Sequence, residues 1–144
     1  MEQFTNVNSE IVERTFQRSF DQLQDVFDLT NEFAITHAIN DKVRYVLDLA
    51  VEEFFTNMVK YNPRGRSALL VRMVLEQKEV IVHLVDPDSA AFDVTKERSV
   101  DLQKSLDERK PGGLGVFLVQ KLVENLHYSH HDRISTISFR LPLE

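Results

Sequence analysis

Apolar residues recur at spacings of three and four along the first half of the chain, which is the period of an amphipathic helix. One such stripe covers residues 20–38. A clearer one begins after Asn40, a good N-cap, and continues until Asn62 and Pro63, where the proline stops the helix. Residues 11–19, before the first stripe, fit an edge strand. The pattern therefore predicts two helices in this half, the second of them largely buried.

After the second helix the pattern changes to short runs rich in Val, Leu and Ile, which are typical of strands. Runs over residues 68–75 and 80–86 are separated by the polar turn of residues 76–79 and predict a hairpin. By the period of two, Asp86 shares a face with the alternate apolar residues of the second run. A carboxylate at the end of an apolar row is unusual for a core.

The last third of the chain predicts one more helix and two short strands. The helix covers residues 114–125, and the strands lie near 126–129 and 134–141. The residues of this helix that we expect to face inward are Phe117, Leu118, Leu122 and Val123. Residues 93–110 are dense in charge with poor periodicity, which favours an exposed lid. We expect one α+β domain over residues 1–144, a two-layer sandwich in which a mixed, mostly antiparallel sheet packs on about three helices.

Composition removes several classes of function. The chain has 144 residues, a formal net charge of -6 and no Cys, which excludes disulfides, thiolate nucleophiles and Cys-ligated metals. It contains no apolar run of membrane-spanning length and no signal-peptide pattern at its start, so the expectation is a cytoplasmic protein. No cluster of Lys and Arg of the kind that binds nucleic acid is present.

Three groups of residues carry candidate chemistry. Glu53 and Asn57 lie four apart in the second helix and project from one face, where they fit a general base and a divalent-metal ligand, or simply a solvated flank. Asp86 fits either an acceptor for a purine amino group or a turn-forming residue before proline. Three of the four glycines lie in the Gly112–Gly115 segment at a helix entry, which fits a phosphate loop or a capping turn.

Other chemistries find little support. His127, His130 and His131 lie near a strand edge, and no further ligand stands at helical spacing from them. They therefore predict exposed turn histidines rather than a metal site. No zinc motif, Gly-x-Ser-x-Gly elbow or P-loop motif is present.

In their order and separation, the three groups resemble the Asn box and the two glycine boxes of the histidine-kinase-like (GHKL) ATPases. The strings VEEFFTNMVKY and PGGLGVFLVQKLVENLHY are most similar to the anti-sigma-factor serine/threonine kinases of that superfamily. The resemblance covers about residues 10–141. It implies that ATP and Mg²⁺ are the ligands.

The resemblance also assigns roles to single residues. It implies that Glu53 is the general base or the acid that positions water, and that Asn57 ligates the Mg²⁺ that bridges the ATP phosphates. Asp86 would accept from the adenine amino group, and strand parity selects Ser135 rather than Thr136 for a hydroxyl near the adenine. The remaining expected nucleotide contacts are Lys60, Asp88, Phe92, Gly113, Leu114 and Gly115.

The chain departs from the family pattern at two positions. The first glycine box normally reads Asp-x-Gly, but Asp88 stands where the glycine is expected, which predicts a weakened or lost nucleotide affinity. The histidine that often closes the Asn box is Tyr61, with Lys60 beside it. Lys60 fits a phosphate contact or a solvated helix end.

The resemblance therefore implies an ATP-dependent serine/threonine kinase that phosphorylates an anti-sigma-factor antagonist and sequesters a sigma factor. It also implies a homodimer. One alternative is a non-catalytic, partner-binding regulator with a degraded nucleotide site. Another is an isolated ATPase domain of a larger signalling protein. The sequence names neither the sigma factor nor the antagonist.

Overall fold

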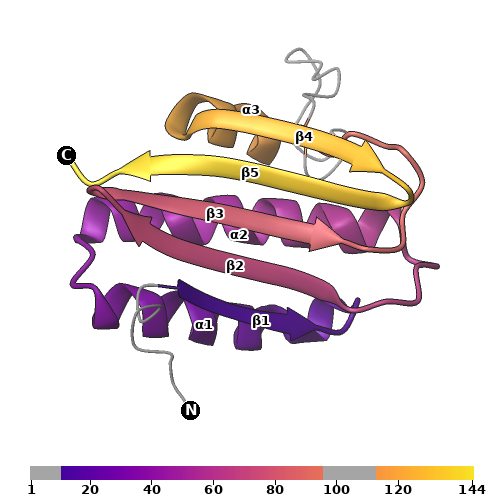
Figure 1. Ribbon diagram of the computed structural model, residues 1–144, viewed down its shortest axis with the longest axis horizontal. Helices are drawn as coiled ribbons and strands as arrows, with labels where there is room; N and C mark the ends of the chain where they lie inside the picture. The colour runs from indigo at the N-terminus through magenta and orange to yellow at the C-terminus, as the bar shows by residue number, and fades with distance from the viewer. Residues whose placement is uncertain (1–10, 96–112) are drawn as a thin grey trace.

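The computed structural model describes residues 11–95 and 113–144, and in these residues helices cover one face of a five-stranded sheet (Figure 1). In chain order the elements are β1 (Ile11–Phe16), the 3-10 turn η2 (Phe20–Gln22), α1 (Leu23–Thr36), α2 (Asp41–Tyr61), β2 (Leu69–Glu76), β3 (Glu79–Asp86), α3 (Gly113–Leu122), β4 (Glu124–His131) and β5 (Ile134–Pro142). The strands lie in the order β1-β2-β3-β5-β4.

The architecture is the predicted α+β two-layer sandwich. Each of the four strand pairs in the described residues is antiparallel, so the sheet is not mixed. β1 forms one edge of the sheet, as expected. The apolar faces of α1, α2 and the sheet meet in one core that includes Phe33, Phe54, Phe55 and Phe139.

Helix α2 follows the predicted boundaries because both of its ends have local stop signals. The Asn40 side chain accepts a hydrogen bond from the Val43 amide at 2.9 Å, which satisfies one of the free N–H groups of the first turn. The helix ends at Tyr61, directly before Asn62 and Pro63. Much of its length is buried, and this rigid element carries the Glu53 and Asn57 pair.

The β2–β3 hairpin is tighter than the sequence predicted. Glu76 and Glu79 still pair across the strands, so only Gln77 and Lys78 form the turn, both with positive φ (51° and 64°). Positive φ at both central residues matches the twist of a two-residue hairpin. The predicted face of β3 is confirmed, because its alternate apolar residues and Asp86 are all buried.

Helix α3 differs from its prediction in length and in the face it buries. It ends at Leu122, and Asn125, expected within the helix, instead has a φ of 54° in β4. Val116, Val119 and Val123 are the buried residues, whereas Leu118 and Leu122 are each 45% exposed. The prediction of an inward Leu118 and Leu122 was therefore wrong. The valines occupy a 3-and-4 spacing of their own, and the packing of α3 on α2 selects that face.

The proposed lid, residues 93–110, lies outside the described residues except for its first three positions. Within the described part of the chain, none of the helices is both long enough and apolar enough to cross a membrane.

Candidate functional site

Glu53 and Asn57 form a hydrogen-bonded pair on α2. The Asn57 amide donates to the Glu53 carboxylate at 3.0 Å, and Asn57 is only 3% exposed. Burial raises the pKa of Glu53, with a smaller contribution from the charge of Glu52, against the lowering effects of the Asn57 hydrogen bond and of Lys60. A carboxylate with a raised pKa is a better proton acceptor when it is ionised.

Gly115 brings the first turn of α3 against this pair. A Cβ atom at position 115 would overlap the Glu53 carboxylate, so a side chain there would force that carboxylate to move. Helix α3 begins at Gly113, and the free N–H groups of a first turn carry partial positive charge. The fold thus joins the Asn-box pair and the second glycine box, 58 to 62 residues apart in sequence, at one point. Gly112 and the side chain of Leu114 lie outside the described residues.

Asp86 is held by donors from three segments. Arg18 donates from both of its terminal nitrogens, one to each carboxylate oxygen, at 2.7 Å. The Asn62 amide donates to Oδ2 at 3.2 Å and the Asp88 N–H to Oδ1 at 3.0 Å. Burial alone would raise the pKa of Asp86, but these hydrogen bonds and the charge of Arg18 together lower it, so the carboxylate is ionised.

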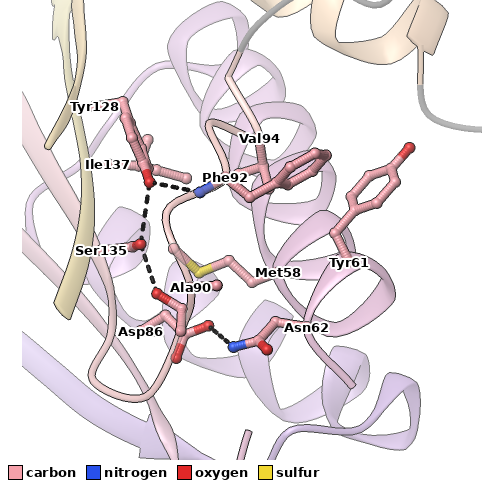
Figure 2. A pocket seen from close by; sticks show the side chains of 11 residues that line it. Met58, Tyr61, Asn62, Asp86, Ala90, Phe92, Val94, Tyr128, Ser135 and Ile137 are labelled. Carbon is pink, nitrogen blue, oxygen red and sulfur yellow. Dashed lines mark hydrogen bonds between the residues drawn. The ribbon is translucent and has the colours of Figure 1, made fainter. Parts of the chain in front are cut away.

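A small cavity lies beside Asp86, between α2 and the sheet (Figure 2). Its volume is about 40 Å³, whereas pockets for drug-sized ligands are roughly 300–1,000 Å³. Met58 projects between Asp86 on one side and Tyr128 on the other. The lining residues are Met58, Tyr61, Asn62, Asp86, Ser89, Ala90, Phe92, Val94, Tyr128, Ser135 and Ile137. The cavity must widen to admit a base.

Hydroxyl groups line the sheet side of this cavity. Ser135 pairs with Asp86 across β3 and β5 and is 5% exposed. Its hydroxyl lies 2.6 Å from that of Ser89 and 3.3 Å from that of Tyr128, which in turn accepts from the Phe92 N–H at 3.1 Å (Figure 2). The parity argument for Ser135 is confirmed as to its face, because Thr136 lies on the opposite side of β5.

Lys60 and Phe92 both lie beside the Tyr61 ring. The Tyr61 and Phe92 rings have centroids 5.0 Å apart, and the Lys60 ammonium lies 5.1 Å from the Tyr61 centroid. Eight residues separate Glu53 from Tyr61, which corresponds to about 12 Å along the helix axis. The Glu53 and Asn57 pair and the cavity are therefore two ends of one elongated site.

Asp88 directs its carboxylate away from the cavity. It accepts from the Arg66 N–H at 2.6 Å and from two nitrogens of Arg133, at 2.8 and 3.1 Å. These contacts lower its pKa. Asp88 is also not among the described non-glycine residues with positive φ, so its backbone does not require the glycine that the family pattern places there.

Because the Asp88 carboxylate makes these contacts outside the cavity, we expect Asp88→Gly to change ATP affinity by less than about threefold. Calorimetric titration with ATP, beside a Glu76→Gly control in the distant hairpin, measures this. A gain of tenfold or more would mean that Asp88 itself obstructs the nucleotide.

The described residues do not contain a cluster of three or more side chains that could hold a metal ion. Asn57 offers one protein ligand, which suits a Mg²⁺ ion because that ion keeps several waters and takes other ligands from substrate phosphates. The donor set fits an ion that arrives with ATP rather than a resident metal.

Several contributors to the site were missed from the sequence. Asn62 was interpreted only as a helix stop, and Ser89 and Tyr128 were not singled out, although Tyr128 shares the parity of Ile137. Arg18 offered no signal, because it lies 68 residues from Asp86. Only the fold brings them together.

Comparison with known proteins agrees with this geometry. A family model described as histidine kinase-like ATPase domain matches residues 16–141. The serine/threonine-protein kinase BtrW of Bordetella bronchiseptica is 31% identical over 93 residues, which cover 63% of this chain and 65% of BtrW. The crystal structure of the RsbU and RsbW domains of Rv1364c from Mycobacterium tuberculosis aligns with a TM-score of 0.65 at 13% identity, over 92% of this chain and 32% of that one. The chain thus spans less than two thirds of either.

Proposed function

Because the chain belongs to the family of histidine kinase-like ATPase domains, we propose that it binds ATP with Mg²⁺ and transfers the γ-phosphoryl group to a serine or threonine of a partner protein. A relative named as a serine/threonine-protein kinase supports kinase activity over nucleotide binding alone.

The observation that carries the proposal is the junction of Glu53, Asn57 and Gly115. A buried amide, a carboxylate with a raised pKa and a glycine at a helix N-terminus meet there. In this proposal Asn57 holds the Mg²⁺, and the first-turn amides of α3, near Gly113 and Gly115, receive the phosphates. Gly115 brings this first turn into contact with the Glu53 carboxylate.

The same residues fit the chemistry of phosphoryl transfer. Bound Mg²⁺ supplies charge neutralisation on the phosphate oxygens. Glu53 accepts the proton of the acceptor hydroxyl while the hydroxyl oxygen bonds to the γ-phosphorus. The bond from that phosphorus to the β–γ bridging oxygen breaks, and ADP leaves. Positioning by the rigid helix α2 does much of the remaining work.

At the other end of the site the cavity receives the base. Asp86 and Ser135 are among its polar groups, and Phe92 and Tyr61 are aromatic surfaces beside it. Lys60 lies against the Tyr61 ring, and its charge lowers the pKa of Glu53. A base enters only when the cavity widens beyond its volume of about 40 Å³.

The partners follow from the resemblance to anti-sigma-factor kinases. The acceptor hydroxyl belongs to an anti-sigma-factor antagonist, and the alternative ligand is a sigma factor, so the protein regulates transcription. By the same resemblance it acts in the cytoplasm as a homodimer. Phosphorylation adds about -1.5 to -2 charges to the antagonist, which is enough to weaken an interface and exchange the partners.

A second candidate function is a regulator that binds its partner without catalysis. The narrow cavity and the complete set of donors on Asp86 favour it, because both oppose base binding. The domain also matches only 32% of a solved chain that joins an RsbW domain to another domain, so this chain also fits a module of a longer protein.

Calorimetric titration with ATP and ADP, with and without Mg²⁺, tests the proposal. We expect Mg²⁺-dependent binding of ATP and transfer of labelled γ-phosphate to a cognate antagonist. Binding without transfer would select the non-catalytic regulator, and no binding at millimolar ATP would refute nucleotide binding itself.

Asn57→Ala should reduce Mg²⁺-dependent ATP affinity by at least about tenfold, because it removes a metal ligand and one charge-assisted hydrogen bond. Titration with ATP in Mg²⁺ and in EDTA measures the loss. Asn31→Ala, which truncates an exposed asparagine of α1, is the matched control. Equal affinities for both variants would contradict the role of Asn57.

A further inference from the structure

Every acceptor position of Asp86 is already occupied within the protein. A carboxylate offers about four lone-pair positions. The hydrogen bonds from Arg18 Nη1 and Nη2, Asn62 Nδ2 and the Asp88 N–H fill them, two on each oxygen. The Arg18 and Asp86 side chains are only 4% and 2% exposed, so this is a buried, bidentate ion pair.

The fold makes a specific seat for the Arg18 guanidinium. Its Nη2 also donates to the Ser67 carbonyl at 3.0 Å. A Cβ atom at position 65 would overlap the guanidinium, so a side chain there would force the guanidinium to move. The fourth glycine of the chain, the one outside the helix-entry segment, thus serves the ion pair on Asp86.

The donors approach Asp86 from different sides. Asn62 lines the cavity, whereas Arg18 does not and reaches the carboxylate from the connection between β1 and η2. The Asn62 bond is the longest of the four, at 3.2 Å, and its Nδ2 keeps a bond of 2.6 Å to the Asp88 carbonyl. An incoming donor from the cavity therefore displaces Asn62 first (Figure 2).

We propose that Arg18 is a positioning residue that keeps the acceptor positions of Asp86 occupied. An amino group of the base then gains a hydrogen bond to Asp86 only by displacing Asn62, so the site does not select for that group. This inference rests on the proposed nucleotide site. The exchange of one donor for another gives little net gain. The wild-type protein then binds a purine nucleotide with a 6-amino group about as tightly as one with a 6-oxo group.

The test compares ATP with ITP, which differ at this position of the base, in the wild-type chain and in Arg18→Lys. Lysine keeps the positive charge but cannot donate to both carboxylate oxygens in a fork, so it frees an acceptor. We expect affinities for ATP and ITP within about threefold in the wild type. In Arg18→Lys we expect a preference for ATP of at least about tenfold, the value of one hydrogen bond to a charged group. Arg14→Lys, on the exposed pair with Glu32, is the control and should keep the wild-type ratio.

Gly65→Ala provides a second route that leaves Arg18 in the sequence. The added methyl group displaces the guanidinium from its seat, so this variant should also gain a preference for ATP. The ratio of two affinities reports on base selection, and a general loss of stability would lower both affinities without changing it.

The outcomes separate this inference from the proposed function. A wild-type preference for ATP of tenfold or more, or a ratio near one in both Arg18→Lys and Gly65→Ala, overturns the inference and leaves the nucleotide site standing. Binding of neither nucleotide by the wild type, by both variants and by Arg14→Lys overturns the proposed function and the inference with it. Binding of ATP by the variants alone overturns both, because each expects the wild type to bind ATP.

Discussion

Glu53→Gln is expected to lower the rate of phosphoryl transfer by about 10²–10⁴-fold, the usual contribution of a general base. Glutamine keeps the shape of the side chain and can still accept from the Asn57 amide, but it cannot take a proton. ATP affinity should stay within a few-fold of the wild type. Transfer of labelled γ-phosphate from ATP to a cognate antagonist measures the rate, and calorimetry measures the affinity.

Glu52→Gln is the matched control, because its exposed carboxylate is adjacent in sequence and lies outside the pair. The wild-type rate should also fall on the acid side at a higher pH than an exposed glutamate would give, since burial raises the pKa of Glu53. A Glu53→Gln variant that transfers phosphate at the wild-type rate would assign the proton transfer to another group.

Arg18→Met should lower the free energy of unfolding by about 3–5 kcal/mol near neutral pH, more than any other substitution proposed for this chain. It leaves the Asp86 charge buried without its main partner. Urea unfolding measures the free energy of unfolding. Arg14→Met removes only an exposed pair with Glu32 and should cost at most about 1 kcal/mol. The double variant Arg18→Met, Asp86→Leu removes both charges and should recover part of the loss.

The pH dependence of this effect has a definite sign. The folded-state pKa of Asp86 lies below its ordinary value of 3.8, so its contribution to stability is present above that value and is lost as the pH falls through the folded pKa. In Arg18→Met, burial instead favours the protonated acid. The difference in unfolding free energy between wild type and variant should therefore shrink as the pH falls from the raised pKa of Asp86 in the variant, above 3.8, down through its lowered pKa in the wild type. A constant difference across this range would show that the variant acts through lost packing.

Local signals account for most of the fold that was predicted. The N-cap at Asn40 and the stop at Asn62 and Pro63 bound α2 because capping and the loss of a backbone donor act within a few residues. The buried face of β3 followed from a period of two. The face of α3 did not follow from its sequence, because Leu118 and Val119 are both apolar and only packing against α2 selects between them.

For the site, the sequence by itself predicted which residues carry chemistry, since Glu53, Asn57, Asp86 and the glycines of the helix entry stand in recognisable local patterns. Tertiary structure alone decided what each of them contacts. The close approach of Gly115 to Glu53 depends on two helices distant in sequence. The occupation of the acceptor positions of Asp86 depends on Arg18. The tertiary structure also showed that the Asp88 carboxylate contacts Arg66 and Arg133 rather than the cavity. Hydrogen bonds between distant segments are fixed by how the layers pack, and no short stretch of sequence encodes that.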